Sequence, residues 1–243
     1  MDRTFRLDGD GFDLEILVDY FHSSRTTVEK TEDQYFLKIE GARWTGDDGI
    51  DWSTAEDELS QINGIAMLLQ PNFRPVTIAG IRTKDPATGA MTMSVRPRAS
   101  GELRIKGKAI PRLVNSDGSV VLQDSTTEAQ KILSSCDEHK HLARALLIYG
   151  ALPHEWRELS MVVDAIEDHH GGEKELQKMD YCPPQLADFT STANSWKAIK
   201  FAARHGRSSQ GVEKPRIELN DAREVIRKLM EDTIKSLTDK PQV

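Results

Sequence analysis

The chain has 243 residues, of which 38% are apolar and 29% are charged, and its formal net charge is −7. This composition is typical of a globular protein with one large domain or two small ones. No apolar run approaches the roughly 20 residues of a membrane helix, and the charged N-terminus lacks the apolar segment of a signal peptide. The two cysteines, Cys136 and Cys182, are too few for a disulfide framework, so we expect a cytoplasmic protein that does not enter a membrane.

The first half of the chain alternates mostly as strands do. Apolar residues at every second position predict a strand over residues 12–18. Further strands are expected at 34–39, 74–81, 90–95 and 101–107, with turns at 85–89 and 115–118. Ser53 and Glu56 form a capping box that predicts the start of a helix, and Pro71 ends this helix. We therefore expect a mixed α/β domain with an antiparallel sheet and one covering helix over residues 1–122.

From residue 125 onward the apolar residues recur at helical spacing. The four resulting stripes predict amphipathic helices around 129–147, 156–166, 186–199 and 222–237. Such helices bury their apolar faces only by packing together, so residues 125–238 are expected to form a helical bundle. The predicted fold class is α+β, with two domains that meet between residues 122 and 125.

Basic residues gather in two segments of a chain that is acidic elsewhere. Residues 74–112 contain nine basic and two acidic residues, and residues 191–216 contain six and one. Residues 1–60, by contrast, contain six basic and sixteen acidic residues. Like charges held close together repel, so these segments indicate an anionic partner, such as RNA or another polyanion. The alternative is that both segments are solvated surfaces that balance acidic ones.

Within the first basic segment, alternation places several cations on one side of the predicted strands. The residues expected to bind nucleic acid there are Arg96, Arg98, Arg104, Lys106 and Lys108. No aromatic residue is interleaved with them, which argues against a platform on which bases of a single strand stack.

In the second basic segment, residues 194–206 hold the most suggestive group of side chains. If one helix runs through them, Lys197, Lys200 and Arg204 share a stripe, and Asn194 and His205 lie beside it. A histidine next to an arginine can transfer protons while the arginine holds a phosphate. A simpler alternative is that Arg204 and His205 complement the dipole at the C-terminus of a helix that Gly206 ends.

Two other clusters contain residue types that commonly bind metals. Cys136 and His139 share a helical face, but no second pair completes a set of four ligands. The acidic run at 47–51 departs from the spacing of a calcium loop, and Asp51 or Ser53 as a helix cap explains it better. No glycine-rich nucleotide loop or serine-hydrolase motif is present, so we expect neither a metal nor a cofactor.

In the second half, helices are followed by the sequence Ala203-Arg204-His205-Gly206, a polar loop and a final helix. This order of elements resembles that of the HEPN superfamily. These small helical bundles occur in bacterial toxins, abortive-infection proteins and RNA-processing enzymes, and the likeness covers residues 125–238. It implies a metal-independent ribonuclease site, in which an arginine and a histidine four to six residues apart meet across a dimer. Here Lys200 has that spacing from His205, whereas Arg204 is adjacent to it. Residues 189–206 also resemble the C-terminal part of uncharacterised bacterial proteins.

The sequence leaves two functions open, and it does not decide whether the chain is an enzyme. The first is a HEPN-like ribonuclease or defence effector, a homodimer through the helical domain, with catalytic residues Asn194, Lys200, Arg204 and His205. The second is a non-catalytic interaction protein, with the bundle for dimerisation and the basic segments, including Lys197 and Arg207, for an anionic partner.

Overall fold

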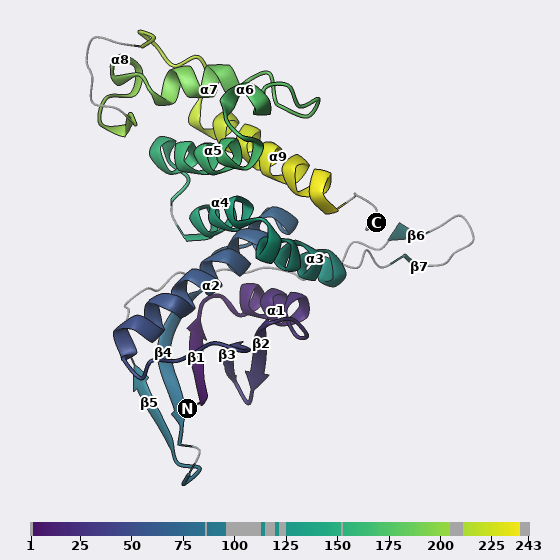
Figure 1. Cartoon of the computed structure of the whole chain (residues 1–243), viewed down its shortest axis with the longest axis vertical. Coiled ribbons are helices and arrows are strands. Elements are labelled where there is room, and N and C mark those ends of the chain that lie inside the picture. Colours follow the sequence, from purple (N-terminus) through teal and green to yellow (C-terminus); the bar gives the residue numbers. More distant parts are fainter. Residues whose placement is uncertain are drawn as a thin grey trace. The chain divides into compact units, whose positions relative to one another are not determined.

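The protein has an α+β fold (Figure 1). The computed structural model describes residues 2–85, 87–95, 113–114, 120–121, 125–151, 153–204 and 211–238. The chain divides into two compact units, residues 1–131 and 132–243. The division lies within helix α3 (Ser125–Glu138), a few residues after the position at which the sequence changes from strand-like to helical spacing.

The first unit is built on a five-stranded antiparallel sheet with the order β2-β3-β1-β4-β5. Its strands are β1 (Asp2–Asp8), β2 (Thr26–Thr31), β3 (Gln34–Ile39), β4 (Thr77–Lys84) and β5 (Met91–Val95). Helix α1 (Gly11–Tyr20) joins β1 to β2, and helix α2 (Asp48–Leu69) joins β3 to β4. This β-α-β-β-α-β succession is the split β-α-β topology of ferredoxin-like folds, with β5 added at one edge. A separate pair of short strands, β6 (Leu113–Val114) and β7 (Val120–Val121), flanks the predicted turn at 115–118.

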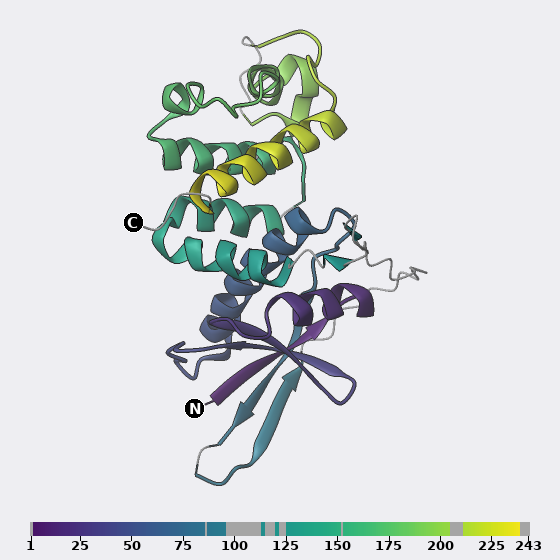
Figure 2. The ribbon, with the colours of Figure 1, turned by 90° about the vertical axis from the view of Figure 1, so that its right-hand side faces the viewer.

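Both helices of this unit cover the same side of the sheet (Figure 2). On that side Phe5 lies opposite Leu37 and Ile81 in the strand register, and all three are buried. Helix α2 adds Ile62 and Ile65, which are fully buried. The expected hairpin of β4 and β5 is confirmed, with the turn closed by the bond from the Gly89 N–H to the Asp85 carbonyl (2.8 Å).

Three sequence-based predictions in this unit are wrong. Two helices, not one, cover the sheet. The strand predicted at 12–18 is helix α1, because the Asp10 side chain accepts a hydrogen bond from the Phe12 N–H and so starts a helix. Short apolar runs do not distinguish the two periods, and the cap decides between them. Helix α2 begins at Asp48 rather than at the Ser53–Glu56 capping box, because Asp47 caps it by accepting from Gly49 and Ile50.

A buried ion pair fixes the start of α2 on the sheet. The Arg3 guanidinium on β1 lies 2.9 Å from Asp51 and 2.8 Å from Asp48, and the Arg3 and Asp51 side chains are only 4% and 2% exposed. Asp51 also accepts hydrogen bonds from the Thr45 N–H and hydroxyl and from the Gly46 N–H. Burial opposes the ionised form, but these bonds and the charge of Arg3 outweigh it and lower the pKa of Asp51.

We predict that Asp51→Asn lowers the free energy of unfolding by about 3–5 kcal/mol, because it leaves the Arg3 charge buried without its buried partner. A carboxyl whose pKa is lower in the folded than in the unfolded protein stabilises the fold above its unfolded pKa, and this stabilisation is lost as the pH falls through the folded value. Urea unfolding between neutral and acidic pH should therefore show a smaller acid effect in Asp51→Asn than in the wild type. Asp48→Asn, at a side chain that is 53% exposed, is the matched control and should cost less than about 1 kcal/mol.

The second unit is helical and centres on α5 (Trp156–His170), which packs against helices before and after it. The helices in contact with α5 are α4 (Lys140–Ala151), α6 (Glu173–Leu176), α7 (Leu186–Ala193) and α9 (Leu219–Thr238). Gly171 ends α5 in the left-handed conformation (φ 86°), as predicted from its sequence position. The single helix expected over 129–147 is instead two, α3 and α4, which meet at His139.

The final helix is confirmed as α9, and its apolar stripe is buried from Ala222 to Ile234. Leu229 is completely buried, so Leu229→Ala should lower the free energy of unfolding by about 2–5 kcal/mol, because apolar burial is reduced and a cavity forms. Lys228→Ala, on the exposed side of the same helix, serves as the control and should change it by less than about 0.5 kcal/mol. Denaturant unfolding of both variants provides the comparison, and equal values would place α9 outside the core.

Candidate functional site

The segment expected to carry the catalytic residues is not one helix. Helix α7 ends at Ala193 with Asn194 as its C-cap, and the next helix, α8, covers only Trp196–Ile199. The buried Ser195 starts this new helix, since its hydroxyl accepts from the Ala198 N–H (3.2 Å) and donates to the Val212 carbonyl (2.6 Å). A 3₁₀ turn, Lys200–Ala202, follows it. The prediction that Lys197, Lys200 and Arg204 share one helical stripe is therefore wrong.

Arg204 has a structural partner. The Arg204 guanidinium lies 2.7 Å from the Asp164 carboxylate on α5, and the backbone N–H of Arg204 donates to the Ala193 carbonyl (2.9 Å). Asn194 keeps its helix-capping position, and its Oδ1 is buried without a hydrogen-bond partner in the described part of the chain. Lys197 and Lys200 are exposed, and neither forms an ion pair with a described residue. His205 and Arg207 lie outside the described residues.

The strand predicted at 101–107 lies outside the described residues. So do the cations predicted to bind nucleic acid in the first basic segment, which are Arg96, Arg98, Arg104, Lys106 and Lys108. The strands that precede them are described, and these strands carry a second set of cations. Arg82 and Lys84 stand on β4, and Arg6 and Lys38 stand on β1 and β3. Three of these strands are neighbours in the sheet, in the order β3-β1-β4.

The strand register places these four cations on the side of the sheet that α1 and α2 leave uncovered. Arg6 lies opposite Phe36, and Arg82 lies opposite Thr4 and Met93. Residues two apart on a strand share a face, so Lys38 and Lys84 face the same way. We call this side the open face; its side chains include Arg6, Phe36, Lys38, Arg82, Lys84, Met91, Met93 and Val95.

The centre of the open face is an arginine stacked on an aromatic ring. The Arg82 guanidinium lies 3.7 Å from the centroid of the Phe36 ring, and its Nε donates to the Thr4 hydroxyl (3.0 Å). Phe36 is only 3% exposed, so the guanidinium, rather than the ring, is presented to solvent. The cation–π contact and the bond to Thr4 hold Arg82 flat against the sheet.

The cations on the two faces of the sheet differ in whether they form ion pairs. On the covered face each cation has an acid: Arg3 pairs with Asp51, and Lys30 pairs with Glu15 on α1 (2.6 Å). Arg25, at the start of β2, pairs with Glu58 on α2. On the open face none of the four cations forms an ion pair with any described residue, although Glu29 on β2 and Asp8 on β1 lie on the same side, and Asp2 on β1 stands opposite Lys84 in the register. The two faces do not differ in their buried Nε atoms, since those of Arg6 on the open face and of Arg3 on the covered face are both buried without a hydrogen-bond partner in the described part of the chain.

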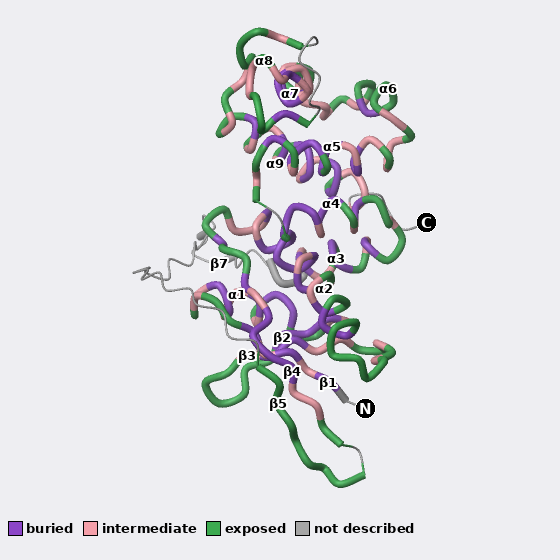
Figure 3. The backbone as a smooth tube through the Cα atoms, turned by 90° about the vertical axis from the view of Figure 1, so that its left-hand side faces the viewer, coloured by how far each residue is buried: buried purple, intermediate pink, exposed green. Residues whose placement is uncertain are grey.

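Beside the cations, the open face continues into an apolar edge. By their register Met91, Met93 and Val95 on β5 face this side, and all three are exposed, with Met91 at 64%. Figure 3 shows β5 as exposed. They lie opposite Lys84, Arg82 and Gly80 in the register. A partner that covered this face would therefore meet positive charge and apolar surface side by side.

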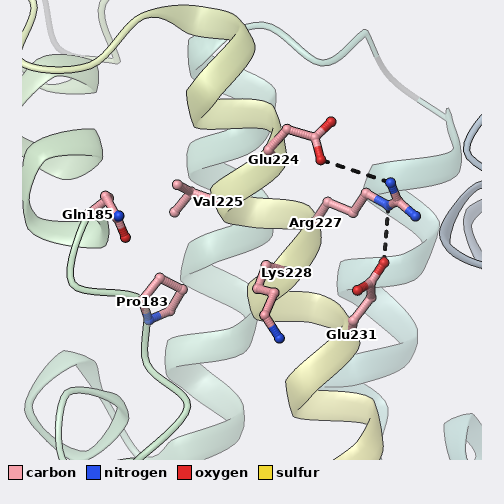
Figure 4. Close-up of a pocket in the computed structure, with 7 residues that line it drawn as sticks. All are labelled: Pro183, Gln185, Glu224, Val225, Arg227, Lys228 and Glu231. Atoms are coloured by element: carbon pink, nitrogen blue, oxygen red, sulfur yellow. Dashed lines mark ion pairs between the residues drawn. The ribbon is translucent and has the colours of Figure 1, made fainter.

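The second unit contains a shallow hollow of about 370 Å³ (Figure 4). It lies between α9 and the segment that holds Pro183 and Gln185, and charged side chains of α9 line most of it. Arg227 pairs with Glu224 (3.9 Å) and Glu231 (3.1 Å), so its charge is already balanced. No group of three or more metal-binding side chains occurs among the described residues, and none of their helices has both the length and the apolar surface to cross a bilayer.

No family model, curated protein or solved structure matches this chain. The function therefore has to be argued from its own residues.

Proposed function

We propose that the first unit binds single-stranded nucleic acid through the open face of its sheet. This proposal rests on a difference between the two faces: the cations of the covered face form ion pairs, and those of the open face do not do so with described residues. Every basic side chain named above on the covered side has an acidic partner, whereas Arg6, Lys38, Arg82 and Lys84 have none among the described residues. Cations that share a face without forming ion pairs favour an anionic partner, and each phosphate they neutralise also releases counterions.

The chemistry of the open face favours a single strand over a duplex. Unpaired bases stack on aromatic rings and on arginine planes, and antiparallel sheets are a common platform for them. Arg82 offers such a plane, held in place by Phe36 beneath it and by Thr4 at its edge. In this proposal one base stacks on Arg82, and its neighbouring phosphates contact Lys38 and Lys84. The exposed Met91 and Met93 give further bases an apolar surface.

The net charge of −7 opposes the approach of a polyanion, so affinity has to come from the local potential of the open face. This potential acts within a Debye length of about 8 Å at physiological salt. We therefore expect modest affinity that falls steeply with salt.

RNA cleavage and dimerisation through the helical unit stay predictions from the HEPN resemblance. The contact of Arg204 with Asp164 gives Arg204 a structural role, and binding by the open face needs no catalytic group. A cleavage assay of the wild type beside His205→Ala tests the ribonuclease separately.

The test of the open face compares lysines on the two sides of one sheet. The double variant Lys38→Ala/Lys84→Ala should weaken binding of a labelled 12-nucleotide RNA, measured by fluorescence anisotropy over a range of salt concentrations. The slope of log affinity against log salt should become shallower by about 0.7 for each phosphate that the variant no longer neutralises. Neither lysine forms an ion pair with a described residue, so the variant should remain folded, with a stability change under about 0.5 kcal/mol per site.

Lys30→Ala is the matched control, since Lys30 belongs to the same sheet but faces α1 and pairs with Glu15. It should leave both the affinity and the salt slope unchanged. Equal reductions of affinity in Lys30→Ala and in the double variant would show that the face of the sheet is irrelevant, and the proposal would fail.

A further inference from the structure

The second unit carries a closed surface loop between α7 and residue 204. The bond from the Arg204 N–H to the Ala193 carbonyl (2.9 Å) joins the two ends of residues 194–203. The Arg204–Asp164 ion pair joins the end of the loop to α5, and the hydrogen bond from the Ser195 hydroxyl joins its start to the Val212 carbonyl. Surface loops whose ends meet in this way are frequently functional.

The exposed part of this loop carries an aromatic ring and two lysines. Phe201 is 86% exposed, whereas five of the seven phenylalanines in the chain are buried. The Trp196 ring packs edge-on against it, with ring centroids 5.1 Å apart and planes at 80°. Lys197 and Lys200 lie between these two aromatic residues in the sequence; both are exposed and have no ion-pair partner among the described residues.

The backbone at this point is strained. Lys200 has φ 52° and ψ −121°, a conformation that residues with a Cβ rarely adopt and that glycine accepts easily. Non-glycine residues held in such conformations cluster at binding and active sites. The strained turn lies immediately before Phe201, where the 3₁₀ turn begins.

We infer that this loop is a second contact for single-stranded nucleic acid, in which one base stacks on Phe201 and the flanking phosphates contact Lys197 and Lys200. The class of ligand rests on the proposed function of the open face, but the residues are independent of it. A peptide partner would also cover an exposed phenylalanine. The two lysines without ion-pair partners among the described residues favour an anionic ligand, and the exposed ring that packs against Trp196 is suited to a flat base.

The experiment measures binding of the full chain to a labelled 12-nucleotide RNA, both single-stranded and annealed to its complement. Phe201→Ala should weaken binding of the single strand by about 5- to 100-fold, the range expected when one stacked base is removed, and leave binding of the duplex within two-fold. Phe201→Leu keeps apolar area without a flat ring and should lose affinity as well, whereas Phe201→Trp should retain it. Lys197→Ala/Lys200→Ala should make the salt dependence shallower.

The outcomes distinguish the proposed contact at the loop from the proposed contact at the open face. Loss of affinity in the Phe201 variants together with normal binding by Lys38→Ala/Lys84→Ala would support the loop and overturn the open face. The reverse pattern would overturn the loop contact alone. Wild-type affinity in Phe201→Leu would identify a general apolar contact, such as that of a peptide, and would overturn base stacking. No binding of either RNA by the wild type at low salt would overturn both proposals.

Discussion

The buried ion pair between Arg3 on β1 and Asp51 on α2 joins the N-terminal sheet to the helix that covers it. A buried arginine is tolerated only with a counter-charge and hydrogen bonds, and the first turn of α2 and the residues before it provide both. The helix layer lies on the side of the buried Phe5 and Leu37, and its acids pair with cations of that side. The opposite side keeps Arg6, Lys38, Arg82 and Lys84 without acidic partners among the described residues. The charge of the open face is thus a consequence of how the sheet is packed.

Much of the fold could be predicted from the sequence where one local signal dominates. Helix α9 has an apolar stripe over its whole length, and the hairpin of β4 and β5 has a turn between two strand-like runs. Residues 12–18 fit both periods, and only the cap formed by Asp10 makes them a helix. Residues 194–204 have helical spacing, but the hydroxyl of Ser195 is engaged by Val212, which no local pattern reveals.

The candidate site was much less accessible to sequence reasoning. No aromatic residue lies among the cations of 96–108, and the ring at the centre of the open face, Phe36, belongs to β3. Its contact with Arg82 joins residues 46 positions apart in the sequence through the register of β3, β1 and β4. The net charge of residues 1–60 also conceals this face, because many of their acids lie on α1 and α2 or pair with covered cations. Side-chain alternation gives the face of each residue, but only the register brings the faces together.

The most direct test of the open face is methyl NMR of the full chain labelled at its seven methionines, titrated with single-stranded RNA. Met91 and Met93 lie on the open face beside Lys84 and Arg82, Met67 lies in α2, and Met230 lies in the core of the second unit. The account predicts saturable shifts of the Met91 and Met93 methyl signals, with those of Met67 and Met230 unchanged. Unchanged Met91 and Met93 signals at a saturating RNA concentration would contradict it.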